Sequence, residues 1–486
     1  MPRECQLFKQ VLQAHARDRA TQPAVVGLGG RFTYAELLAA VEQRQAWLAA
    51  QPSGTLVLGL DNGPEALFWD LAALFAGRPV VVLPTFFSSA QRCHCLAQSG
   101  AVLALIDEGF ADDLLAAGFS AGERFWHRLP PACASVPPGT AKLTFTSGST
   151  GAPKGVCLGA PALLRVAREL EAASRSAAPG IYLAVLPMAV LLENIGLYAG
   201  LLAGAQLMLY PSAQLGLRGA SQVDLRRLLG AVALSGAHSL ILVPQLLLGL
   251  VTAVERGLMQ VGPLRFVAVG GGRVAPSLLA RAEAVGLPVF EGYGLSECAS
   301  VVCLNRPGDR RPGSVGRPLP HVQVRIAEDG EVMVAGSMML GYLGEAPLRT
   351  PWFATGDLGR LDSDGFLHLA GRKKHQYSTA YGRNVNPEWV EAELTQGGVI
   401  AQAFVHGDGL ARNLALLWPL DPLADAAALE QAVHQANQGL PDYAQVHAWQ
   451  RLPEPLSTAQ QTLTANGRPR REQILQRYQA LLSDVQ

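Results

Sequence analysis

The chain has 486 residues, of which 49% are hydrophobic and 16% are charged. This length fits two or more domains, and the apolar fraction is sufficient for a large core, so a disordered chain is excluded. Lysine and arginine together number 39 residues, and aspartate and glutamate together also number 39, so the formal net charge is zero. Because no net positive field attracts a polyanion, a nucleic-acid partner is not expected.

The cysteines and the N-terminal segment indicate a cytoplasmic protein. Seven cysteines, an odd number, do not suggest a disulfide framework. Cys93 and Cys95 flank His94, which raises the alternative of a metal site, but no second ligand pair stands nearby at zinc spacing, and a structural role is favoured. The N-terminus lacks an apolar signal-peptide core, and polar residues interrupt the most apolar stretch, 181–210. We therefore expect no membrane-spanning segment.

Short apolar strands alternate with helix-length segments over the first half of the chain. A helix is expected at 64–75. The expected strands are 55–60, 79–83, 102–106, 183–186, 206–210, 239–243 and 266–269. Strands separated by helices predict parallel βαβ units, and continuously apolar strands are typically buried on both faces. We therefore expect an α/β fold with a large N-terminal domain of parallel sheets.

The pattern changes after about residue 310. Two short strands, 322–326 and 331–334, bracket an Asp329-Gly330 turn, which is a hairpin signal. A second hairpin is expected around 361–369. These hairpins predict an antiparallel, barrel-like β region at the end of the large domain.

A basic run at 372–375 separates this region from a small α+β tail. The tail begins with a helix expected at 387–394, for which Asn386 is a suitable N-cap. We therefore predict a large N-terminal domain over residues 1–371 and a small C-terminal domain over residues 372–486.

The segment 144–155, TFTSGSTGAPKG, combines hydroxyls, glycines and one lysine beside an apolar strand. Glycines let backbone N–H groups approach a polyanion, hydroxyls donate to its oxygens, and a lysine neutralises its charge. A plain Ser/Gly/Thr linker is the alternative. The expected phosphate-binding residues are Thr146, Ser147, Gly148, Ser149, Thr150, Gly151 and Lys154.

This segment resembles the phosphate-binding loop of the acyl-adenylate-forming superfamily, which includes acyl-CoA synthetases, carrier-protein acyl ligases, adenylation domains and luciferases. Four more segments match superfamily motifs in order: 291–297 (EGYGLSE), 355–357 (TGD), 371–374 (GRKK) and 380–387 (AYGRNVNP). The resemblance covers nearly the whole chain. It implies an acid–thiol ligase that uses ATP and Mg²⁺ to convert a carboxylic acid into acyl-AMP. The acyl group then passes to the thiol of coenzyme A or of a carrier-protein phosphopantetheine.

The resemblance also implies roles for the residues of the adenine motif. Tyr293 would stack on adenine, Ser296 would contact the α-phosphate, and Glu297 would hold Mg²⁺ as a catalytic residue. These roles are physically reasonable, because a flat ring suits a flat base and a hard oxygen ligand suits a hard cation. The remaining nucleotide-binding positions in this part of the chain are Gly271, Gly272 and Gly294, although 270–272 is equally well an ordinary tight turn.

Residues around the predicted domain boundary receive roles by the same resemblance. Asp357 would accept hydrogen bonds from the ribose hydroxyls, and Arg372 would contact the nucleotide. Lys374 stands at the hinge position that absorbs the rotation of the small C-terminal domain, which the resemblance implies is mobile. Gly382 and Arg383 belong to the loop that enters the site for the thiol half-reaction.

The C-terminal segment departs from the superfamily pattern. The superfamily usually has a lysine in a Thr-x-x-Gly-Lys-x-x-Arg context, whereas residues 464–471 read TANGRPRR and place Arg468 there; no lysine follows Lys374. Arginine keeps the charge but presents a planar fork instead of a point donor. We expect Arg468 to take the catalytic role of the lysine. Two alternatives remain open: a protein that binds nucleotide or acyl-adenylate without making it, and a subunit that consumes acyl-AMP made elsewhere.

The substrate is inferred from the segments that line the acyl pocket in the superfamily. Met188, Val190, Glu193 and Gln245 are the expected pocket residues, although Glu193 is equally explained as a capped helix residue. No acidic residue is clearly placed to pair with an amino-acid ammonium, so an aliphatic acid is favoured, and an aryl acid stays open. The expected partners are a small carboxylic acid and, as an alternative acceptor to coenzyme A, a carrier protein. The oligomeric state is either monomer or homodimer.

Overall fold

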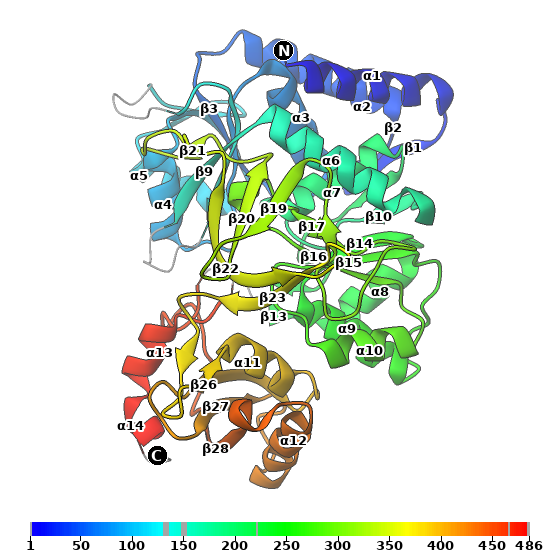
Figure 1. The fold of residues 1–486 in the computed structure, drawn as a ribbon. Coiled ribbons are helices and arrows are strands. Elements are labelled where there is room, and N and C mark those ends of the chain that lie inside the picture. The colour runs from blue at the N-terminus through cyan, green and yellow to red at the C-terminus, as the bar shows by residue number, and fades with distance from the viewer. Residues whose placement is uncertain (1, 130–135, 147–152, 220–221, 465–466, 484–486) are drawn as a thin grey trace.

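The computed structural model describes residues 2–129, 136–146, 153–219, 222–464 and 467–483. Figure 1 shows a large part that contains both N-terminal sheets and a smaller lobe, drawn in orange and red, below it. No helix within the described ranges is long and apolar enough to cross a membrane. The domain boundary at 371/372 stays a prediction.

Two largely parallel sheets form the large part. Over the described residues, the first sheet contains, in spatial order, β18 (Arg317–Pro318), β17 (Cys303–Leu304), β16 (Val289–Tyr293), β15 (Phe266–Val269), β14 (Ser239–Leu242), β10 (Ile181–Leu183), β11 (Gln206–Leu209), β1 (Pro23–Gly27) and β2 (Gly30–Thr33). The second contains β21 (Gly341–Tyr342), β9 (Lys154–Gly159), β8 (Thr140–Thr146), β4 (Val80–Val82), β3 (Thr55–Gly59), β5 (Ala101–Ile106), β7 (Trp126–His127) and β6 (Ser120–Ala121). Parallel pairs such as β14–β15 and β3–β4 confirm the predicted βαβ units.

Helices pack on and between these sheets. They are α1 (Arg3–Asp18), α2 (Tyr34–Ala49), α3 (Pro64–Ala76), α4 (Ser89–Gln98), α5 (Ala111–Ala116), α6 (Ala160–Ser174), α7 (Leu191–Leu202), α8 (Leu225–Ser235), α9 (Pro244–Glu255) and α10 (Pro276–Ala284). The helix predicted at 64–75 is α3, which begins at a proline and ends at Gly77 in the left-handed conformation. Nearly all of α3 is buried, so this helix forms part of the main core.

One predicted strand is misplaced. The sequence predicts a strand at 183–186, but β10 ends at Leu183. The chain leaves the sheet because the amide of Leu186 donates to the carboxylate of Glu193 at 2.9 Å instead of continuing the ladder. Pro187, which follows, has no amide proton to offer a neighbouring strand.

The barrel-like antiparallel region is confirmed. β16, β17 and β18 form a half-barrel, and a neighbouring sheet contains β19 (Val322–Ile326), β20 (Glu331–Gly336), β22 (Phe353–Leu361) and β23 (Leu367–Arg372). The predicted Asp329-Gly330 turn joins β19 to β20, with Gly330 at φ 82°. The two sheets share one apolar core, so they act as a single support for the strands that carry site residues.

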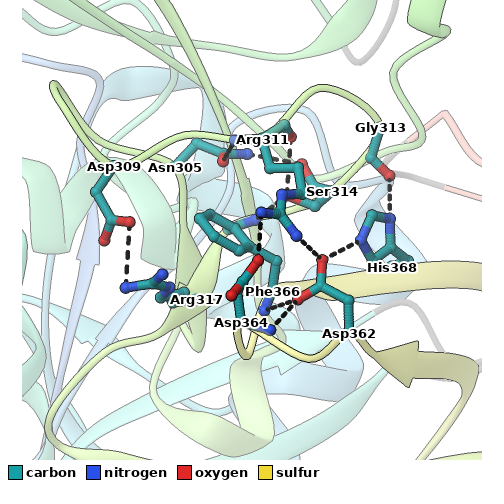
Figure 2. Close-up of polar contacts among 11 residues, drawn as sticks. Asn305, Asp309, Arg311, Gly313, Ser314, Arg317, Asp362, Asp364, Phe366 and His368 are labelled. Carbon is teal, nitrogen blue, oxygen red and sulfur yellow. Dashed lines mark hydrogen bonds and ion pairs between the residues drawn. The ribbon is translucent and has the colours of Figure 1, made fainter.

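A cluster of ionic contacts fixes the far end of the β22–β23 hairpin. Figure 2 shows the guanidinium of Arg311 between Asp362 and Asp364, at 2.6 Å from each carboxylate. The same guanidinium lies 4.6 Å from the ring centroid of Phe366, and His368 contacts Asp362 at 3.0 Å. The segment before β18 is thereby attached to the hairpin.

The smaller lobe is an α+β unit. It contains β24 (Tyr377–Ser378), β25 (Asn384–Val385), α11 (Pro387–Thr395), β26 (Ile400–His406), β27 (Asn413–Pro419), α12 (Ala426–Gln438), β28 (Val446–Arg451), α13 (Arg471–Arg477) and α14 (Gln479–Ser483). Asn386 accepts a hydrogen bond from the amide of Glu388 at 2.9 Å, which confirms the predicted N-cap of α11. The lobe touches the large part where Arg281 of α10 donates to the carbonyl of Gln396 at 2.7 Å.

Candidate active site

The predicted phosphate-binding segment lies at the open end of the β8–β9 hairpin. Thr146 pairs with Lys154 across this hairpin. Ser147, Gly148, Ser149, Thr150 and Gly151 lie outside the described residues. The side chain of Lys154 is 50% exposed, and its Nζ lies 3.2 Å from Glu345 Oε1. An accessible ammonium therefore stands at the end of the segment, as the sequence predicts.

The backbone that follows β16 is sharply bent. A Cβ on Gly294 would lie 1.5 Å from the carbonyl oxygen of Ser300, so only glycine fits there. Ala299 and Ser300 both have positive φ, at 56° and 100°, a conformation that is costly for residues other than glycine. Glu297 and its neighbour Ser296, which lie within this bend, are both half-buried.

Tyr293 and Asp357 meet although 64 residues separate them. The hydroxyl of Tyr293 donates to Asp357 Oδ2 at 2.7 Å, and Arg372 Nε lies 3.0 Å from Asp357 Oδ1. Arg372 also donates to the carbonyl of Thr355 at 2.8 Å. Burial raises the pKa of Asp357, while the charge of Arg372 and the hydroxyl of Tyr293 oppose that rise. The residues predicted for adenine, ribose and nucleotide contact are therefore neighbours.

Arg468 of the small lobe contacts the large part near these residues. Its Nη2 donates to the carbonyl of Gly271 at 3.3 Å, and Gly271 itself has φ 77°. Burial and the neighbouring Arg372 lower the pKa of Arg468, whereas Glu388, Asp357 and Glu297 favour its charged form. The guanidinium thus stands near Asp357 and Glu297 of the large part and Glu388 of the small lobe, next to the glycine turn at 270–272.

Residues at the hinge are arranged differently from one another. Lys373 and Lys374 are both exposed, and Lys373 forms ion pairs with Asp329 at 2.5 Å and Glu331 at 3.0 Å. Partial desolvation of the ammonium and the nearby Arg372 lower the pKa of Lys374. His375 contacts Glu388 at 2.7 Å, an interaction that no sequence motif indicated.

The predicted thiol-reaction loop forms an exposed turn on the small lobe. Gly382 donates to the carbonyl of Thr379 at 2.8 Å, and Thr379 in turn donates to the carbonyl of Arg383 at 2.9 Å. Ala380 donates to the carbonyl of Leu410, which also belongs to this lobe. These contacts attach Gly382 and Arg383 to the small lobe, whereas Arg468 of the same lobe contacts Gly271 in the large part.

The expected acyl-pocket residues have unequal surroundings. Met188 is buried, Val190 is half-buried and Gln245 is exposed. Glu193 is 0% exposed, and its carboxylate accepts hydrogen bonds from the hydroxyl of Tyr182 and the amide of Leu186. Burial raises the pKa of Glu193 to about 8. The structure therefore places this carboxyl in the core, where it closes the strand end after β10.

Aliphatic side chains flank the glycine turn that Arg468 contacts. A Cβ on Gly270 would lie 3.9 Å from Leu192, one on Gly271 would lie 3.7 Å from Val243, and one on Gly272 would lie 3.5 Å from Pro244. The wall beside the guanidinium is consequently apolar.

Two places in the chain are candidates for metal binding: the segment 93–95 and Glu297. Over the described residues, no group of three or more His, Cys, Asp and Glu side chains could hold a metal ion. His94 instead contacts the carbonyl of Pro153 at 3.0 Å, and Cys93 Sγ lies 3.8 Å from Asp113, so structural contacts account for these two residues. Glu297 is a different case, because Mg²⁺ usually takes one or two carboxylates together with phosphate oxygens and water. A single half-buried carboxylate beside the phosphate-binding segment fits that donor set.

Sequence reasoning missed Tyr342 and Glu345. The hydroxyl of Tyr342 donates to Glu297 Oε1 at 2.9 Å, and the ring centroid of Tyr342 lies 5.0 Å from Lys154 Nζ. No local pattern marks these residues, because they reach the site only through pairing of β21 with β9.

Comparison with known proteins identifies the family to which the chain belongs. Residues 12–343 match the family described as AMP-binding enzyme, and residues 375–485 match the AMP-binding enzyme C-terminal domain. A long-chain-fatty-acid–CoA ligase, FadD15 of Mycobacterium bovis, is 40% identical over 169 residues, which are 34% of this chain and 28% of that ligase. The match thus spans under a third of that relative's length. The 2-succinylbenzoate–CoA ligase of Bacillus velezensis is 28% identical over 415 residues, 78% of this chain and 80% of the relative.

Solved structures share the fold along nearly the whole chain. The anthranilate CoA ligase AuaEII in complex with anthranoyl-AMP has a TM-score of 0.81 at 17% identity and covers 98% of both chains. The o-succinylbenzoate CoA synthetase of Bacillus subtilis, in complex with its acyl-adenylate intermediate, has a TM-score of 0.74 at 23% identity, covering 96% of this chain and 97% of that one. The fold expected from the sequence is confirmed. Because two family matches together cover most of the chain, the protein belongs to the family of AMP-binding enzymes.

Proposed function

We propose that this protein activates a carboxylic acid with ATP and then transfers the acyl group to the thiol of coenzyme A. The observation that carries this proposal is that four groups lie near one another. Lys154 and Glu297 both contact Tyr342, and Arg468 lies near Glu297 and near Asp357, which binds the hydroxyl of Tyr293. Those groups supply a phosphate-binding cation, a flat ring beside an acceptor carboxylate, an oxygen ligand and a second cation, which are the components that acyl adenylation requires.

In the first half-reaction the carboxylate oxygen of the acid forms a bond to the α-phosphorus of ATP. The bond between that phosphorus and the bridging oxygen of the β-phosphate breaks, and pyrophosphate leaves with the electron pair. Mg²⁺, when bound, neutralises charge on the triphosphate. Tyr293 and Asp357 hold the nucleoside, Lys154 neutralises phosphate charge, and Arg468 pairs with the carboxylate and the α-phosphate.

In the second half-reaction the thiol sulfur attacks the acyl carbon, and AMP leaves as its phosphate oxygen takes the electron pair of the anhydride bond; the thiol proton passes to solvent. Gly382 and Arg383 belong to the lobe that carries Arg468, so a rotation at Lys374 that moves Arg468 away from Gly271 would bring a different face of the lobe toward the nucleotide-binding residues. Hinge motions of domains are a known way to complete a catalytic site.

The substrate that the surroundings favour is an aliphatic acid. Leu192, Val243 and Pro244 lie beside the turn that Arg468 contacts, and the buried carboxyl of Glu193 is held by Tyr182 and Leu186. Apolar side chains next to a cation that can pair with a carboxylate suit a fatty acid better than an amino acid. Coenzyme A is the proposed acceptor, with carrier-protein phosphopantetheine as the competing one, and a cytoplasmic location is part of the proposal.

The test is pyrophosphate release from ATP and Mg²⁺ over a panel of fatty, aryl and amino acids, with hydroxylamine present to trap acyl-adenylate. We expect release with aliphatic acids, abolished by Lys154→Ala, and thioester formation when coenzyme A replaces hydroxylamine. Release with aryl or amino acids alone would refute the aliphatic assignment. If ATP binds but no acid releases pyrophosphate, the protein is a nucleotide-binding or acyl-AMP-consuming protein instead. Supplying acyl-AMP together with coenzyme A distinguishes these two alternatives, because only the acyl-AMP-consuming protein would form the thioester.

A further inference from the structure

The short strand β21 attaches a distant segment to the phosphate-binding hairpin. Tyr342 pairs with Val156, and the amide of Leu343 donates to the carbonyl of Gly155 at 2.7 Å. A Cβ on Gly155 would lie 3.0 Å from Cβ of Leu343. The last glycine of the phosphate-binding segment therefore contacts the residue that follows β21.

The same segment is attached to the turn that contains Glu297. The amide of Met339 donates to the backbone carbonyl of Glu297 at 2.7 Å, and the hydroxyl of Tyr342 donates to Glu297 Oε1 at 2.9 Å. The backbone and the side chain of Glu297 are therefore both held by the segment that contains β21.

The ring of Tyr342 lies between two candidate catalytic groups. Its hydroxyl contacts the carboxylate of Glu297, and its face lies 5.0 Å from the ammonium of Lys154. A cation over an aromatic face is attracted by the ring quadrupole. One side chain thereby contacts both the oxygen ligand and the cation, from a short strand that is paired with β9.

We propose that Tyr342 is a positioning residue for the metal and triphosphate site: its hydroxyl fixes the carboxylate of Glu297, which would hold Mg²⁺. This inference rests on the proposed function, in which Glu297 ligates Mg²⁺. Partners that orient a ligating carboxylate typically change metal affinity by ~10- to 100-fold when they are removed. Tyr342 does not itself touch the reacting atoms.

The decisive variant is Tyr342→Phe, which keeps the ring beneath Lys154 and removes only the hydroxyl. The measurement is ATP binding by calorimetry across a series of Mg²⁺ concentrations, with no acid present. We expect the Mg²⁺ concentration at half-maximal ATP binding to rise ~10- to 100-fold, and saturating Mg²⁺ to recover wild-type ATP affinity. Tyr443→Phe, a half-exposed tyrosine on the small lobe, is the matched control and should leave the Mg²⁺ requirement unchanged.

Repeating the substitution in a Glu297→Gln protein shows whether Tyr342 acts through Glu297. In Glu297→Gln, adding Tyr342→Phe should cause no further change in the Mg²⁺ requirement. A folded Tyr342→Phe with the Mg²⁺ requirement of the wild type would overturn the inference, as would a full additional effect in the Glu297→Gln background. Because the readout is binding without acid, a wild type that binds MgATP but releases no pyrophosphate refutes the proposed function alone. A wild type whose ATP binding does not depend on Mg²⁺ overturns both.

Discussion

Lys142 is a charged residue in the middle of the core, and its removal should be strongly destabilising. Its side chain on β8 is 3% exposed, and its Nζ lies 2.7 Å from Oδ1 of Asp70 on α3, which is 0% exposed. Asn194 and Tyr198, both on α7, complete the contacts: Asn194 Oδ1 accepts from Lys142 at 2.5 Å, and the Tyr198 hydroxyl donates to Asp70 Oδ2 at 2.6 Å. Burial lowers the pKa of Lys142, while the charge of Asp70 opposes that change.

The perturbation is Lys142→Met, which preserves most of the side-chain volume and removes the charge. Asp70 then remains buried without its cation. Breaking one side of such a pair typically costs about 3–5 kcal/mol, because the remaining charge is desolvated without compensation. The double variant Lys142→Met/Asp70→Leu removes both charges, and replacing a buried pair by apolar groups is often neutral or stabilising. We therefore expect the double variant to regain most of the lost stability.

The assay is urea unfolding at pH 7, followed by tryptophan fluorescence, with the midpoint compared among wild type and the two variants. A matched surface control is Lys9→Met, whose ion pair with Glu42 at 2.9 Å is partly exposed and should contribute at most about 1 kcal/mol. A Lys142→Met protein that loses less than about 1 kcal/mol, or a double variant less stable than the single one, would refute the reasoning.

Three further predictions concern catalysis, nucleotide affinity and pH. Arg468→Ala should lower acid-dependent pyrophosphate release by ~10²- to 10³-fold but spare thioester formation from supplied acyl-AMP; equal losses in both assays would contradict a role confined to adenylation. Glu345→Gln removes an anion that competes with the triphosphate for Lys154, so ATP should bind up to about fivefold more tightly by calorimetry, since an exposed pair contributes at most about 1 kcal/mol; weaker binding would assign Glu345 to the site itself. The pKa of Glu193 is raised from 4.5 to about 8 in the folded protein, so its stabilising contribution is complete below pH 4.5 and is lost as the pH rises through 8. Glu193→Gln should accordingly flatten the fall in melting temperature between pH 6 and pH 9, and an unchanged slope would mean that this carboxyl is not protonated in the fold.

The parts of the fold that follow from local sequence were predictable. The helix at α3 and the cap at Asn386 depend on residues within one turn, and the Asp329-Gly330 hairpin depends on two adjacent residues. The strand at 183–186 failed because its end is decided by Glu193, seven residues later, which captures the amide of Leu186. Apolar composition alone does not reveal such a competing acceptor.

Some residues of the candidate site were likewise predictable from local sequence motifs, and others were not. Tyr293, Asp357 and Arg372 were named from their motifs, and the structure brings them into contact. Tyr342 and Glu345 were missed because their part in the site comes from strand pairing between segments far apart in sequence. The burial of Glu193 was likewise invisible, since a carboxylate at a helix start is commonly solvated.

The attachment of β21 to β9 has a consequence for biosynthesis. Lys154 and Glu345 are 191 residues apart, so the phosphate-binding hairpin cannot acquire its outer strand until the ribosome has extended the chain well beyond residue 342. Contacts of such long sequence separation form late, because loop closure has to precede them. Until then β9 is an unpaired edge, which is the kind of surface that recruits other strands. A nascent chain halted between β9 and β21 should consequently be the aggregation-prone species, and chaperone dependence should fall once residue 342 has emerged.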